Sequence, residues 1–275
     1  MRYYTRFLLV GAASGFICIF NYAKNGMAQT FADIVMLFGF SSADCQLNHI
    51  LEGTHWYMPL FLFQIFYGTY IYRHFCSASI YFFSRCCSRT RWFLKEALTL
   101  YLFAVAYLLA ALAGGGGAAR LFGTVTPGAE LLPLLWHYLA IHSLFLFATT
   151  LLINILSVLS SSDTGFLIVE GVAFFFIAAF FITGELFIPG GLVREIPHEN
   201  VWMLLGNPFA HLVLYLHEGR MPAMDSSIII HGISISMWTS TAVFFTAGIL
   251  VLLWGCYIVN HYDLVGADHE AEGGY

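Results

Sequence analysis

Long stretches with few or no charged residues recur along the chain, and they limit the folds that are open to it. A helix that crosses a bilayer core of about 30 Å needs roughly 17–25 predominantly apolar residues. Stretches of this kind lie at residues 7–23, 55–71, 97–113, 133–159, 165–188 and 236–259. Only 10% of the residues are charged, compared with about 25% in an ordinary soluble domain. The sequence therefore predicts a single all-α integral membrane domain, residues 1–275, with six transmembrane helices.

The positions of the basic residues set the expected orientation. Five of the eleven lysines and arginines lie in the loop at residues 72–96, between the second and third predicted helices. Lys and Arg are retained on the cytoplasmic side of a membrane, so we expect this loop and both termini to be cytoplasmic. Residues 24–54 and 189–235 then form two long outer segments.

The N-terminal stretch allows two interpretations. It has a basic start, an apolar run and the small residues Gly26 and Ala28 on either side of Met27, which is typical of a cleaved signal peptide. We expect an uncleaved first helix, and a cleaved signal peptide is the alternative.

Short interfacial helices are expected in the outer segments. The first segment repeats apolar residues at the spacing of one helical face, at Phe31, Ile34, Val35 and Phe38. This stretch is too polar at its ends to span a membrane, so we expect it to lie on the outer surface. In the second segment, aromatic and histidine residues between 201 and 218 favour an interfacial belt over a ligand-binding lid.

Glycine, serine and proline mark the expected helix ends. Four successive glycines, Gly114 to Gly117, favour no regular structure, so we expect the third helix to fray there. Ser162 or Asp163 is placed to cap the fifth helix, and Pro133 suits the first turn of the fourth.

Several chemistries are excluded by what the sequence lacks. The two lysines, Lys24 and Lys95, do not follow a glycine, so the phosphate-binding loop G-x-x-x-x-G-K-[ST] is absent. The cysteines and histidines do not have the spacing of a structural metal site. We therefore expect no catalytic residue, metal or cofactor in this chain, and any ATP that drives it is expected in a partner.

Two carboxylates and one histidine are expected at membrane depth. A charge there is costly and usually faces the protein interior or a water path. Glu170 and Glu185 fall in the fifth predicted helix, and His137 falls in the antiparallel fourth. We expect Glu185 to pair with His137, and Glu170 to lie near Asn154. The alternative is that each side chain reaches the nearer membrane interface.

The basic loop at 72–96 contains an apolar patch, residues 75–83, between its basic ends. A segment that only bound lipid headgroups would not need such a patch. We therefore expect a short helix that lies beneath the membrane and presses on a partner protein.

The text of this loop resembles a known family. Residues 84–95 read SRCCSRTRWFLK, which resembles the run S-R-x-x-S-R-x-x-W-x-x-x-K of small permeases, with Lys95 one residue closer to Trp92 than in that run. Those permeases belong to peptide-antibiotic and bacteriocin transport or immunity systems of Gram-positive bacteria. The layout of six spans, a basic loop after the second span and a very short turn after the fourth is similar to membrane subunits of type-2 ABC exporters.

The resemblance implies a permease of the bacterial plasma membrane that moves a hydrophobic or amphipathic peptide, antibiotic or lipid-like molecule. Two permeases, identical or different, would each dock on a cytoplasmic ATPase subunit that holds ATP and Mg²⁺. The residues implied in coupling to that ATPase are Tyr72, Arg73, Phe75, Ile80, Tyr81, Phe82, Phe83, Arg85, Arg89 and Asp163. The residues implied in the substrate path are Phe63, Phe66, Tyr67, Tyr70 and Glu170.

Two other functions stay open from the sequence. The chain could be a membrane-bound binding or sensor subunit without a transport cycle, in which the outer segments capture a peptide and the basic loop recruits a partner. It could also be an intramembrane enzyme, which the missing motifs disfavour. An ATPase encoded beside this chain would favour the permease.

Overall fold

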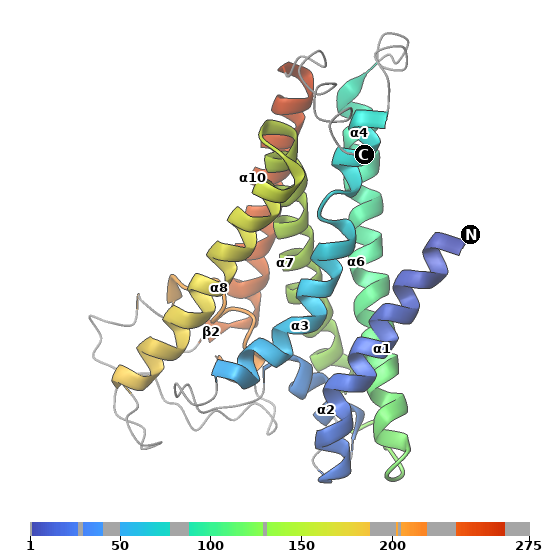
Figure 1. Cartoon of the computed structure of the whole chain (residues 1–275). Coiled ribbons are helices and arrows are strands. Elements are labelled where there is room, and N and C mark those ends of the chain that lie inside the picture. Colours follow the sequence, from blue (N-terminus) through green and yellow to red (C-terminus); the bar gives the residue numbers. More distant parts are fainter. Residues whose placement is uncertain are drawn as a thin grey trace.

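The computed structural model describes residues 2–26, 30–40, 50–77, 88–128, 131–187, 202, 205–218 and 235–261, which form a bundle of long helices (Figure 1). The helices are α1 (Arg2–Lys24), α2 (Phe31–Phe38), α3 (Ile50–Tyr67), α4 (Tyr70–Ser77), α6 (Arg89–Arg120), α7 (Leu131–Leu159), α8 (Ser162–Phe187) and α10 (Met237–His261). A short 3-10 helix, η4 (Leu214–Leu216), precedes the strand β1 (His217–Glu218), which pairs in parallel with β2 (Ile235–Ser236).

Five of the described helices are long and apolar enough to cross a membrane. They are α6, α7, α10, the part Arg6–Lys24 of α1 and the part Ser162–Thr183 of α8. These helices agree with the expectation of a helical, multi-pass membrane protein. The second predicted span corresponds to α3, which has 18 residues, contains Pro59 and is not one of the five.

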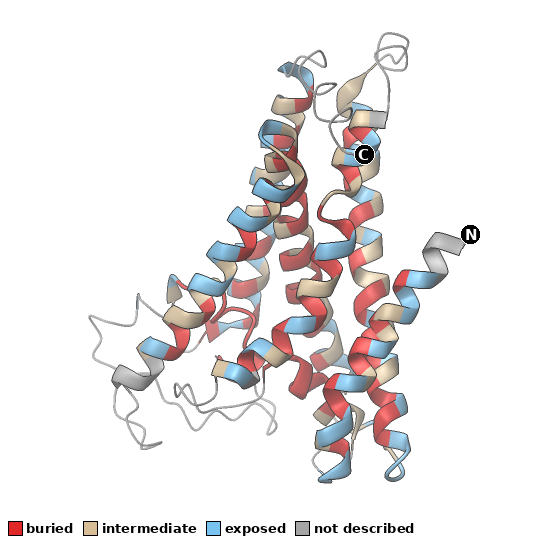
Figure 2. Cartoon of the chain, in the orientation of Figure 1, coloured by how far each residue is buried: buried red, intermediate tan, exposed pale blue. Residues whose placement is uncertain are grey.

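Many positions of α8 and α10 are exposed, whereas α7 has few exposed positions (Figure 2). Large apolar side chains occupy several of the exposed positions. Leu167 and Phe175 of α8 and Leu250 and Leu253 of α10 are each between 61% and 68% exposed. Extended apolar surface of this kind marks contact with lipid or with another protein.

Helix α1 packs along α6 through small residues. A Cβ atom built on Gly15 would lie 1.9 Å from the carbonyl oxygen of Ala111, and one on Gly114 would lie 1.9 Å from that of Ala12. Because both helices lack side chains there, their backbones approach closely. Helix α6 continues through the four glycines to Arg120, so the expected fraying is wrong. The gain from close packing outweighs the low helix propensity of glycine.

The helix predicted in the first outer segment is present as α2, but it is buried in the bundle. Thr30 Oγ1 accepts a hydrogen bond from the Asp33 N–H at 3.1 Å, and Asp33 Oδ2 accepts one from the Thr30 N–H at 2.7 Å. This capping box fixes the start of the helix. Ile34 and Val35 are fully buried, because α2 packs against α6 and α7. The helix therefore does not lie on the surface of the bundle.

The short turn between α7 and α8 is confirmed, but the residue that caps α8 is Ser161. Its Oγ accepts a hydrogen bond from the Thr164 N–H at 3.3 Å, which is the cap-to-third-residue contact. Ser162 is already the first residue of the helix, and its hydroxyl donates to Asp163 Oδ1 at 3.2 Å. The expected cap was therefore one or two residues too late.

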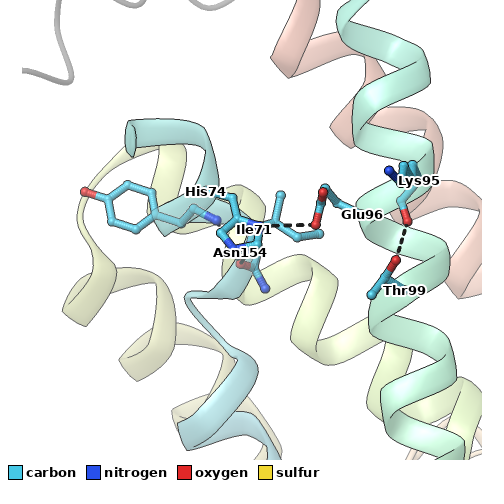
Figure 3. Close-up of polar contacts among 7 residues, drawn as sticks. Ile71, His74, Lys95, Glu96, Thr99 and Asn154 are labelled. Atoms are coloured by element: carbon cyan, nitrogen blue, oxygen red, sulfur yellow. Dashed lines mark hydrogen bonds and ion pairs between the residues drawn. The ribbon is translucent and has the colours of Figure 1, made fainter. Parts of the chain in front are cut away.

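Helices α3 and α4 are separated by a break at Gly68, and Asn154 of α7 bridges it (Figure 3). The Oδ1 atom of Asn154 accepts hydrogen bonds from the backbone N–H groups of Ile71, at 2.7 Å, and Tyr72, at 3.1 Å. Its Nδ2 atom donates to the carbonyl oxygen of Tyr67 at 3.0 Å. A broken helix in apolar surroundings needs such partners for its backbone. The hydrogen bonds of the Asn154 side chain therefore go to the break and to its own helix, and the expected nearness of Asn154 to Glu170 stays a prediction.

Helix α4, the start of α6 and the end of α10 meet at one end of the bundle, at the top of Figure 1. Asn260 Nδ2 donates to Thr90 Oγ1 at 2.8 Å, and Arg89 donates to the carbonyl oxygen of Val259 at 3.4 Å. We call this the basic end, because it carries Arg73, Arg89, Arg91 and Lys95.

Candidate functional site

A chain of four buried or half-buried polar side chains lies between α3, α7 and α8. The hydroxyl of Tyr57 lies 3.2 Å from both Gln64 Oε1 and Glu170 Oε2. Gln64 Nε2 donates to Thr149 Oγ1 at 2.9 Å. Tyr57 and Gln64 are seven residues apart on α3 and share one helical face, while Thr149 comes from α7 and Glu170 from α8. We call these four residues the polar chain.

Glu170 is the member of the polar chain with the fewest polar partners. Its side chain is 4% exposed, and its Oε1 atom has no hydrogen-bond partner among the described residues. No lysine, arginine or histidine in that part of the chain forms an ion pair with it. Burial of an unpaired carboxylate is costly, so a residue of this kind indicates a functional site.

An apolar cavity of about 180 Å³ adjoins the polar chain. Tyr57 and Thr149 are the polar residues of its wall, and Phe209 closes one side. The segment that contains Phe209 is held against α8 by Asn207, whose Nδ2 donates to the carbonyl oxygen of Phe176 at 2.9 Å. The cavity can therefore hold a small apolar group directly beside two members of the polar chain.

A cleft of about 460 Å³ lies at the basic end and also reaches the polar chain. Its lining includes Gln64, Thr69 and Arg73 from the α3–α4 region and Asp163 from α8. Gln64 thus belongs to both the cleft and the polar chain. One member of the polar chain, Gln64, therefore lines the cleft, and two others, Tyr57 and Thr149, line the apolar cavity.

The residues expected to couple to an ATPase lie in different surroundings. Arg73 is exposed and shares the cleft with Asp163, and Tyr72 is half-buried. Phe75 is 1% exposed and packs on Trp92, with ring centroids 6.1 Å apart, so it supports α4 from within the bundle. Arg89 binds the end of α10 as described above. The remaining residues lie outside the described part of the chain, namely Ile80, Tyr81, Phe82, Phe83 and Arg85.

Three of the expected substrate-path residues lie together in the structure. Phe63 and Tyr67 are fully buried, with ring centroids 4.9 Å apart, and the ring of Tyr70 lies 5.8 Å from that of Tyr67. Phe63 lies against Tyr107 of α6, with ring centroids 5.3 Å apart, and Tyr67 and Tyr70 lie against Phe103 of α6, at 5.2 and 5.8 Å. Phe66 is 40% exposed on the outside of the bundle. The other three aromatic side chains therefore belong to the core against α6, whereas Glu170 contacts Tyr57 of α3.

The pairing of His137 with Glu185 stays a prediction. The ring of His137 lies edge-on to Trp238 of α10, with centroids 5.5 Å apart. The side chain of Glu185 lies outside the described part of the structure.

A second buried polar group lies at the end opposite the basic end. Ser240 Oγ of α10 lies 2.8 Å from His211 Nδ1 and 2.7 Å from His217 Nε2. The other ring nitrogens contact the carbonyl oxygens of Leu205 and Val213, each at 2.9 Å. Burial lowers the pKa of His217 to about 4, so its ring is neutral near pH 7. These two histidines are buried and join residues 205–218 to α10, and the expected interfacial belt stays a prediction.

No protein-family model, curated protein or solved structure matches this chain. Within the described residues, no group of three or more His, Cys, Asp or Glu side chains is suited to hold a metal ion. The resemblance to small permeases therefore rests on the loop text and the helix layout.

Proposed function

We propose that this chain is the membrane-spanning permease subunit of an ABC transporter, which moves a hydrophobic or amphipathic molecule across a bacterial plasma membrane. A separate cytoplasmic subunit hydrolyses ATP with Mg²⁺, and a second permease, identical or different, completes the assembly. The observation that carries the proposal is the meeting of two distant segments at the basic end. Arg73 of α4 and Asp163 at the start of α8 border one cleft, where a single partner can contact both.

The contacts of α4 suggest how a motor at the basic end acts on the bundle. His74 Nδ1 lies 3.2 Å from Glu96 Oε2, which joins α4 to α6. Asn154 joins the break at Gly68 to α7. A push on α4 therefore reaches both α6 and α7, while the break lets α3 tilt separately. Coupling of this type requires two discrete packings and no reactive side chain.

The space beside the polar chain suits an amphipathic cargo. The cavity wall is apolar apart from Tyr57 and Thr149, so it accepts an apolar group and offers hydroxyls at one edge. The contact between Tyr57 and Glu170 closes the space between α3 and α8, and tilting of α3 against α8 would change this contact. We therefore propose that Tyr57, Gln64 and Glu170 line the substrate path, in place of the aromatic residues of α3 that the sequence predicted.

Copurification with the ATPase encoded beside this chain tests the proposal. We expect the complex to hydrolyse ATP, and Arg73→Glu to abolish assembly or cargo-stimulated hydrolysis while membrane insertion is unchanged. Asp163→Lys, on the other wall of the cleft, should have the same effect. The matched control is Arg120→Glu, an exposed arginine at the far end of α6, which should leave assembly intact. Normal assembly and stimulation in both cleft variants would refute docking at the basic end.

A further inference from the structure

The polar chain has a direction that follows from the hydrogens available to it. The hydroxyl of Thr149 lies 2.8 Å from the carbonyl oxygen of Phe145, and a backbone carbonyl can only accept. The single hydroxyl hydrogen of Thr149 is therefore donated to Phe145. The oxygen of Thr149 then accepts from Gln64, which places the amide NH₂ of Gln64 toward Thr149.

This orientation of Gln64 decides the rest of the polar chain. The carbonyl oxygen of the Gln64 side chain faces Tyr57 and needs a donor. Tyr57 has one hydroxyl hydrogen, and it is used in that bond. The oxygen of Tyr57 can then only accept from Glu170, 3.2 Å away. A carboxylate has no hydrogen to donate, whereas a protonated carboxyl has one.

The surroundings of Glu170 favour the same protonation state. Helix α3 contributes Tyr57 and Gln64, and α7 contributes Thr149, all of them uncharged near pH 7. Tyr57 is the titratable group that reaches Glu170 among the described residues, and no positive side chain there pairs with it. The Oε1 atom of Glu170 also has no donor. An ionised carboxylate in this position would carry a buried charge with neither counter-ion nor full hydrogen bonding.

We propose that Glu170 is a proton-binding site, which holds a proton in the packing of α3 against α8 seen here and releases it to water when these helices separate. On release, the O–H bond of the carboxyl breaks and its proton passes to a water molecule, which leaves a carboxylate. Gln64 lines the cleft at the basic end but is fully buried in this packing, so we expect water to enter and the proton to leave on that side only once α3 and α8 separate. The inference rests on hydrogen-bond geometry and does not depend on the ATP-driven function.

Infrared spectroscopy of the full-length protein in lipid nanodiscs tests this directly. Exposed carboxyl groups are ionised at pH 7, so a C=O stretch of a protonated carboxyl arises only from a buried, neutral group. We expect such a band at pH 7 and its loss in Glu170→Gln, whose amide still donates to Tyr57. The matched control Glu185→Gln, in the same helix, should retain the Glu170 band.

Two outcomes would overturn the proposal. One is the absence of a protonated-carboxyl band from the wild-type protein at pH 7. The other is a difference spectrum in which Glu170→Gln loses carboxylate stretches and not the C=O stretch. If Glu170→Gln does not fold, Tyr57→Phe provides the second test. It removes the acceptor of the carboxyl O–H and should shift the band, whereas an unshifted band would contradict the bond between Glu170 and Tyr57.

Discussion

The break between α3 and α4 depends on the side chain of Asn154, so Asn154→Ala should destabilise the bundle strongly. The variant leaves the N–H groups of Ile71 and Tyr72 without their acceptor in apolar surroundings. A buried polar group that loses its partner costs about 1–3 kcal/mol, so two such groups give a loss of about 2–4 kcal/mol after local relaxation. Closing the break into a continuous helix would avoid this cost, but it would pull Phe75 away from Trp92.

Reversible unfolding of the full-length protein in mixed micelles measures this loss. The matched control is Asn260→Ala, which removes another asparagine side chain with two hydrogen bonds, to Thr90 Oγ1 and to the carbonyl oxygen of Cys256. Asn260 is exposed, so the control should change the free energy of unfolding by no more than about 0.5 kcal/mol. Equal losses in the two variants would refute the role assigned to Asn154.

Two further predictions concern the packing of α1 and the outer histidines. Gly114→Ile places a side chain against the backbone of Ala12 and should destabilise the contact between α1 and α6 by about 1–3 kcal/mol in thermal unfolding. A Cβ atom built on Gly117 meets nothing within 4 Å, so Gly117→Ile is the control, and an equal effect there would contradict the close approach. Burial lowers the pKa of His217 from 6.5 to about 4, so the unfolded chain binds a proton at a higher pH than the folded chain. Stability should be complete above about pH 6.5 and fall by about 3 kcal/mol by about pH 4. His217→Gln should flatten this slope, and a wild-type stability that increases toward pH 4 would show that the ring is not buried as a neutral group.

Helix positions could be predicted because apolar length and spacing are local properties. The apolar face that begins at Phe31 gave α2, and the uncharged stretches gave the long helices. The prediction that the third helix frays at its four glycines was wrong. Whether these glycines break or stabilise the helix depends on the packing of α1, including Ala12, against them. The burial of α2 was missed for a similar reason, because spacing indicates an apolar face but not which protein surfaces cover it.

The site could be predicted only in part. Glu170 was identified because a charge at membrane depth is costly wherever its partners lie. Tyr57 and Gln64 were missed, although their seven-residue spacing on one face of α3 was a usable pattern. The role of Asn154 could not be read from the sequence, because the backbone groups that it binds are more than 80 residues away and become free only at the break.

The most direct test of the account is photocrosslinking in intact cells from two positions on the bundle. A crosslinking amino acid replaces either Arg73, in the cleft at the basic end, or Arg120, at the far end of α6. We expect position 73 to crosslink to the neighbouring ATPase and position 120 to give no such product. A crosslink from position 120, or none from position 73 in an intact assembly, would contradict a motor docked at the basic end.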